Sequence, residues 1–366
     1  MASHQPKPDA LPPTTSVGAV GWLRNNLFST WYNSLLTLVI LYLLIRYLTP
    51  LFDWAILEAD FAGTSTEDCD SEGACWVFLQ QRFGFFIYGF YPEAERWRVN
   101  IAFVLLAIVL IPQFIEGFPW RKWLGIFGLT GFPIICWFLI AGGAFGLKPV
   151  AATEWGGLML TLTLAYIGIL SSLPIGIVLA LGRRSSMPVI RGICVVFIEI
   201  WRAVPLITVL FMASVMLPLF LPEGVNFDKL LRALIGITLF WSAYMAEVVR
   251  GGLQAIPKGQ YEAADALGLN YWKKTGLIIL PQALKIVIPG IVNTFIALFK
   301  DTTLVLIIGL FDVLATVQST IIDPEWQAVD AEGYLFVGFC FWVFCFGMSR
   351  YSQALERKLH TGHKKT

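Results

Sequence analysis

The chain has 366 residues, of which 57% are hydrophobic and only 14% are charged. Ordinary soluble domains are about 45–50% apolar and about 25% charged, so a soluble globular fold is excluded because it has no means of burying this much apolar surface. The formal net charge of +1 gives no indication of a nucleic-acid partner. The composition is that of an integral membrane protein whose partners include membrane lipid.

The N-terminal residues 1–30 are expected to form a polar tail, because they lack the apolar region of a signal peptide. Eight later stretches are apolar enough to cross a membrane, which takes about 20 apolar residues for a hydrocarbon core of about 30 Å. We expect these spans near residues 31–50, 98–112, 123–142, 155–182, 192–217, 231–249, 289–311 and 333–350. The predicted fold is therefore an all-α, polytopic transmembrane helical bundle of about eight spans.

The basic residues are distributed unevenly between the two sides of these spans. With the N-terminus inside, 17 of the 26 Lys and Arg residues lie in cytoplasmic segments, six lie on the opposite side and three lie within spans. Cytoplasmic loops of membrane proteins carry an excess of Lys and Arg. Both tails, residues 1–30 and 354–366, are therefore expected to be cytoplasmic.

The chain divides near residue 150. Residues 31–150 hold three spans and a polar exported loop without a recognisable motif, so we expect an accessory region that packs beside the rest. Cys69 and Cys75 both lie in that loop, where an oxidising compartment favours a disulfide, although two free thiols fit the spacing equally well. Residues 155–353 hold five spans with short loops and are expected to be the working domain.

One cytoplasmic loop, residues 250–284, is long and patterned. Residues 260–267 are good helix-forming sequence with acids in the early turns, where the helix dipole favours them, and Gly268 follows as a C-terminal stop. Residues 271–280 predict a second amphipathic helix that ends at Pro281. Two short helices of this kind form a ledge on the inner face of the membrane.

Small side chains at Ala263 and Ala264 keep one side of this ledge low, so that another protein can approach its backbone. The segment reads Glu262-Ala263-Ala264, three residues, Gly268, nine residues, Ile278, one residue, Leu280-Pro281. This spacing resembles the EAA loop of ATP-binding cassette (ABC) importer permeases of type I at every fixed position. The match is far more specific than an isolated Glu-Ala-Ala.

The flanking sequence resembles the polar amino acid branch of these permeases, the histidine, glutamate and glutamine type. The similar segments are EIWRAVPL at 199–206, AEVVRGG at 246–252, IPKGQ at 256–260 and KDTTL at 300–304. The resemblance covers residues 155–353 and implies a five-helix permease core. The extra N-terminal spans resemble the larger permease subunit of general L-amino acid uptake systems of Gram-negative bacteria.

The resemblance implies a transport subunit of the bacterial inner membrane rather than an enzyme. Such permeases work in pairs, identical or related, and a periplasmic amino-acid-binding protein delivers the solute. The EAA loop docks on a separate ATPase, and this assigns the following residues to the ATPase contact: Tyr261, Glu262, Ala263, Ala264, Gly268 and Pro281. No GxxxxGK(S/T) phosphate loop occurs, so we expect ATP on the partner and no cofactor, metal or catalytic residue on this chain.

Five ionisable residues lie within or beside the spans of the core, namely Glu199, Arg202, Glu247, Lys300 and Asp301. Such residues cost about 2.5–3.5 kcal/mol each on insertion scales and usually face the bundle interior. They form either a charged lining for a zwitterionic solute or ion pairs that lock the helices together, and we favour the pairs because buried charges need partners. A secondary transporter or channel for a small polar solute is the alternative function.

Overall fold

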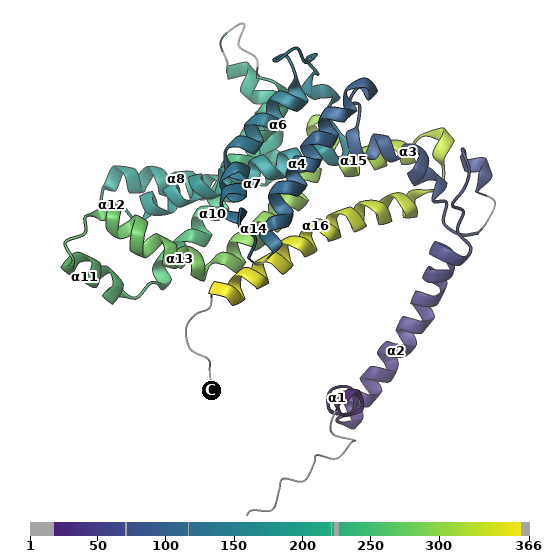
Figure 1. The fold of residues 1–366 in the computed structure, drawn as a ribbon, viewed down its shortest axis with the longest axis horizontal. Coiled ribbons are helices and arrows are strands. Elements are labelled where there is room, and N and C mark those ends of the chain that lie inside the picture. The colour runs from purple at the N-terminus through teal and green to yellow at the C-terminus, as the bar shows by residue number, and fades with distance from the viewer. Residues whose placement is uncertain (1–17, 70–71, 116, 221, 223–226, 360–366) are drawn as a thin grey trace, which may run out of the picture. The chain divides into compact units, whose positions relative to one another are not determined.

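The computed structural model describes residues 18–69, 72–115, 117–220, 222 and 227–359, and the regular structure of these residues is helical (Figure 1). The chain forms two compact units, residues 1–78 and 79–366. Residues 1–17 and 360–366 of the two expected tails lie outside the described residues.

The first unit contains a short helix, α1 (Gly18–Asn26), and a long apolar helix, α2 (Trp31–Phe52). The Thr30 side chain caps α2 by accepting a hydrogen bond from the Asn33 amide. This helix coincides with the first expected span and buries none of its apolar window within the chain. In the loop that follows, a disulfide joins Cys69 to Cys75 with their Cα atoms 5.7 Å apart.

The second unit holds the remaining spans, after α3 (Val77–Tyr88) at its boundary. Five of its segments are long and apolar enough to cross a membrane: α4 (Arg96–Phe114), α7 (Gly157–Arg183), α10 (Lys229–Ala255), α14 (Ile288–Asp301) with its 3-10 continuation to Ile308, and α16 (Asp330–Leu359). With α2, the described residues contain six such helices, and up to eight if each of two bent helix pairs is one span.

The two bent pairs lie where the third and fifth spans are expected. One joins α5 (Arg121–Leu129) to α6 (Gly131–Ala141) at 51°, and the other joins α8 (Pro188–Ala203) to α9 (Leu206–Phe211) and its continuation at 103°. The span expected near residues 192–217 is therefore built from two helical pieces rather than from one continuous helix. Val204 is extended, with φ −105° and ψ 137°, because a residue that precedes proline disfavours the α conformation. Pro174, by contrast, stays inside α7.

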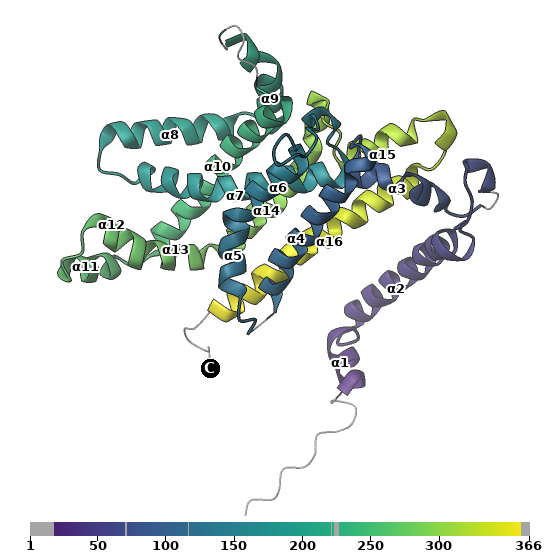
Figure 2. The same ribbon diagram turned by 45° about the horizontal axis from the view of Figure 1, so that its top comes forward.

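The centre of the second unit is the contact between α7 and α10 (Figure 2). A Cβ on Gly176 of α7 would lie 2.7 Å from the Met245 Cβ of α10, so the glycine permits this close approach. Val99 of α4 and Ile140 of α6 belong to the same buried cluster as Leu160 of α7. Helices α4 and α6 thus share a core with the helices after residue 150, while the expected functional division near residue 150 stays a prediction.

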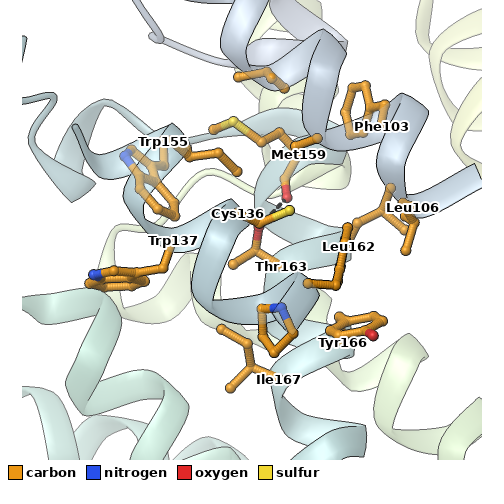
Figure 3. A pocket seen from close by; sticks show the side chains of 15 residues that line it. Phe103, Leu106, Cys136, Trp137, Trp155, Met159, Leu162, Thr163, Tyr166 and Ile167 are labelled. Carbon is orange, nitrogen blue, oxygen red and sulfur yellow. Dashed lines mark hydrogen bonds between the residues drawn. The ribbon is translucent and has the colours of Figure 1, made fainter. Parts of the chain in front are cut away.

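A small apolar cavity of about 60 Å³ lies between α4, α6 and the start of α7. Figure 3 shows Phe103, Cys136, Met159 and Thr163 around it. No charged side chain lines this cavity, so it offers no ionic partner to a polar solute.

On another face of the second unit, α3 lies beside α15 (Val313–Ile321) in both ribbon views (Figures 1 and 2). Arg82 of α3 pairs with Asp323 and Glu325, each at 3.1 Å, in the segment after α15. These ion pairs fasten α3 to the connection that leads into α16.

Candidate functional site

The loop between α10 and α14 forms a group of short helices at one end of the second unit, where α11, α12 and α13 lie together (Figure 1). The first, α11 (Lys258–Ala266), starts directly after Pro257. Gly268 then adopts φ +69°, and the Leu269 amide donates to the Ala264 carbonyl at 3.2 Å. This is the glycine stop that the sequence predicts, because a left-handed residue after a helix costs glycine little.

The second helical segment runs further than expected. It comprises α12 (Tyr271–Lys274), a π-helical turn from Thr275 to Ile279, and α13 (Leu280–Ile286). The prediction that Pro281 ends this helix is wrong, because Pro281 lies in the first turn of α13. Proline fits a first helical turn, where its missing N–H has no helical partner to lose.

The side chains of α11 divide between an outer and an inner face. Glu262 and Ala263 are exposed, whereas Ala264 is only 1% exposed. The expectation that both alanines lie on the open side is therefore wrong for Ala264, which packs inward because neighbouring helical residues point about 100° apart. The loop also exposes large apolar side chains that the sequence did not single out, namely Leu267, Tyr271, Trp272, Leu277 and Ile286.

Tyr261 anchors α11 to the ends of two long helices. Its hydroxyl donates to the Leu253 carbonyl of α10 at 3.1 Å. The Arg184 guanidinium, just past the end of α7, donates to that carbonyl at 2.6 Å and to the Tyr261 hydroxyl at 3.1 Å. The half-buried Tyr261 thus makes its polar contacts within the chain.

Next to this anchor, Glu247 of α10 is the centre of a cluster of charges. It accepts hydrogen bonds from Arg250, the shortest at 2.7 Å, and pairs with Arg183 of α7 at 3.0 Å and with Arg202 of α8 at 3.7 Å. Arg183 also pairs with Glu199 of α8 at 2.9 Å. Three of the five predicted intramembrane charges therefore take part in ion pairs that join α7, α8 and α10.

Lys300 and Asp301 at the end of α14 lie outside this cluster. Neither side chain makes an ion pair with a described residue, and Lys300 is exposed whereas Asp301 is half-buried. In the part of the chain that the structure describes, no group of three or more His, Cys, Asp and Glu side chains is placed to hold a metal ion.

Residues 172–361, which include this loop and the charge cluster, match the family described as "Binding-protein-dependent transport system inner membrane component". The inner membrane amino-acid ABC transporter permease protein YhdY of Escherichia coli (strain K12) is 54% identical to this chain. The match covers 99% of this chain and 98% of YhdY. The glutamate/glutamine/aspartate/asparagine transport system permease protein BztC of Rhodobacter capsulatus is 40% identical over 96% of both chains. A solved structure described as "Crystal structure of an amino acid ABC transporter with histidines" is 30% identical to this chain, with a TM-score of 0.48. The match covers 55% of this chain and 92% of that one.

Proposed function

The chain belongs to the family of binding-protein-dependent transport system inner membrane components, and we propose that it is a permease subunit of an ABC importer that moves L-amino acids into the cell. It is a multi-pass protein of the inner membrane. ATP is bound and hydrolysed by separate ATPase subunits, and a periplasmic amino-acid-binding protein supplies the solute. The chain pairs with a second permease that is identical or related to it. The projecting loop over residues 258–286 is the observation that carries this proposal.

The loop offers a docking surface for the ATPase. Glu262, Ala263 and Gly268 are exposed on it, and the exposed Leu267 and Trp272 supply apolar area that no described part of the chain covers. Exposed apolar side chains that gather on one projection mark protein interaction sites. We place this surface and both termini in the cytoplasm, as the excess of basic residues on that side indicates.

Transport follows from movement of this loop. When the ATPase subunits close on ATP, they displace α11, and α7 and α10 tilt with it because α11 is hydrogen-bonded to the ends of both helices. Tilting of packed helices as rigid bodies converts an inward-open pathway into an outward-open one. We propose Lys300 and Asp301 as candidates for lining this pathway, since no described partner neutralises either of them.

The docking surface is tested by co-purification of the ATPase with variants of the full complex. Glu262→Ala removes an exposed charge, and Gly268→Val forces a β-branched residue to φ +69°, a conformation that costs L-residues about 1–2 kcal/mol. Both variants should insert normally and lose most of the bound ATPase. Glu356→Ala, which removes an exposed charge near the C-terminal end of α16, is the matched control. Normal recovery of the ATPase with both loop variants would refute the docking surface.

The whole function is tested in proteoliposomes that contain the purified complex. We expect amino acid uptake to require ATP on the side of the vesicle membrane where the ATPase subunits lie. The binding protein must be present on the opposite side. Uptake that an ion gradient alone sustains would instead establish a secondary transporter or channel.

A further inference from the structure

Two consecutive arginines at the end of α7 reach in different directions. Arg183 pairs with Glu199 of α8 and Glu247 of α10, at 2.9 and 3.0 Å. Arg184 reaches α11 and the last turn of α10, where it meets Tyr261 and the Leu253 carbonyl. One helix end is therefore bonded to two spans and to the projecting loop.

The carbonyl of Leu253 is available because of a proline. In a helix this carbonyl would accept from the amide four residues later, which is position 257, and Pro257 has no N–H. Two donors replace the missing one, the guanidinium of Arg184 at 2.6 Å and the hydroxyl of Tyr261 at 3.1 Å. Leu253 itself is only 2% exposed, so an unpaired carbonyl here would be costly.

The ring of Tyr261 strengthens the same contact. The Arg184 guanidinium carbon lies 5.7 Å from the ring centroid, within the range of a cation–π interaction. The ring also packs against the buried cluster that includes Ile256 and Ile279. The hydroxyl and guanidinium can therefore be removed one at a time while the apolar packing of α11 remains.

We propose that Arg184 and Tyr261 are positioning residues that transmit the displacement of α11 to α7 and α10. This inference rests on the proposed function and deepens it, because it separates the residues that hold the ATPase from those that pass on its movement. Tyr261 does not contact the ATPase; it ties α11 to the spans. Loss of the tie leaves the ATPase docked and active but lowers the amount of solute moved for each ATP hydrolysed.

The test compares Tyr261→Phe and Arg184→Ala in the reconstituted complex of permeases, ATPase and binding protein. We expect ATPase co-purification and hydrolysis to stay near wild type while uptake per ATP falls about tenfold, because each variant loses two of the three hydrogen bonds that link Arg184, Tyr261 and the Leu253 carbonyl. Arg184→Lys should recover part of the loss, since lysine keeps the charge without the planar fork of donors. Tyr334→Phe on α16 and Arg191→Ala on α8 remove the same groups from exposed positions and should behave as wild type.

A second measurement tests the attachment of α11 to α7 and α10 independently of transport. Amide hydrogen exchange over residues 258–267 should rise in both Tyr261→Phe and Arg184→Ala, because α11 loses its attachment. Unchanged exchange, an unchanged ratio of uptake to hydrolysis, or loss of the ATPase from Tyr261→Phe would overturn the inference. If the wild-type complex fails to transport with ATP, the proposed function is refuted. The exchange data then still show whether Arg184 and Tyr261 attach α11 to the two spans.

Discussion

Replacement of Glu247 by glutamine should weaken the bundle more than any other single charge removal in the cluster. The Glu247 side chain is 16% exposed and is the shared partner of Arg183, Arg202 and Arg250. Glutamine is similar in size and can still accept one hydrogen bond, but it leaves Arg202 and Arg250 without their carboxylate partner and Arg183 with Glu199 alone. Glu199→Gln is the matched control, because Glu199 is 54% exposed and, among the described residues, forms an ion pair with Arg183 alone.

The magnitude follows from these exposures. Removal of one partner of a buried ion pair costs about 3–5 kcal/mol, and we take about 3 kcal/mol for Glu247 because water still reaches part of the side chain. An exposed pair contributes about 0–1 kcal/mol, which is the expected cost of Glu199→Gln. At roughly 2 °C per kcal/mol for a large domain, the apparent unfolding midpoint should fall by about 6 °C for Glu247→Gln and by about 2 °C or less for Glu199→Gln.

Tryptophan fluorescence of the purified protein in detergent, heated at one fixed rate, measures both midpoints. A fixed rate matters because the apparent midpoint of an irreversibly unfolding protein depends on the scan rate. Equal shifts for the two variants, or a larger one for Glu199→Gln, would show that Glu247 is not the centre of the cluster and would refute the reasoning.

Three further predictions concern other parts of the chain. Gly252→Ala should destabilise the protein by about 1–3 kcal/mol, because its Cβ would lie 2.6 Å from the Ala283 carbonyl oxygen. Gly251→Ala has nothing within 4 Å of its Cβ and should leave the midpoint unchanged or raise it slightly in the same melting assay, since alanine favours a helix interior over glycine by about 1 kcal/mol. Burial raises the pKa of Asp312, which lies outside the spans, to about 6 from an ordinary 3.8. The folded protein therefore loses stability as pH rises between these values, and Asp312→Asn should raise the melting midpoint at pH 7 but not at pH 4. Reduction of the Cys69–Cys75 disulfide should cost its loop about 2 kcal/mol and speed proteolysis there; equal cleavage of the oxidised and reduced forms would contradict this.

The sequence predicts where the spans lie, because a stretch of about 20 apolar residues is long enough to cross the hydrocarbon core of a membrane. It also predicts the end of α11, since Gly268 carries its own conformational signal in the left-handed φ of +69°. The fixed spacing of the EAA segment, residues 262–281, locates the candidate docking loop because it can be read directly along the chain. Each of these inferences depends on residues close together in the chain.

The prolines show where such local inference ends. Pro174 stays inside α7, Pro205 accompanies a 103° break, and Pro281 lies in the first turn of α13 after a π-helical turn. All three residues lack the same N–H and disfavour the same conformation before them. The outcome is set by the donors and the packing that neighbouring segments supply, and a single stretch of sequence does not contain that information.

The intramembrane charges make the same point for side chains. Glu199 and Arg202 lie three residues apart on α8, a spacing that permits a pair worth only about 0.2–0.5 kcal/mol on a helix surface. In the structure Glu199 pairs with Arg183 of α7 and Arg202 with Glu247 of α10. These partners come within reach because α7 and α10 touch at Gly176, where any Cβ would lie 2.7 Å from Met245. The pairing therefore depends on an interhelical contact that lies two turns before Arg183 on α7 and two residues before Glu247 on α10, which the spacing along α8 does not encode.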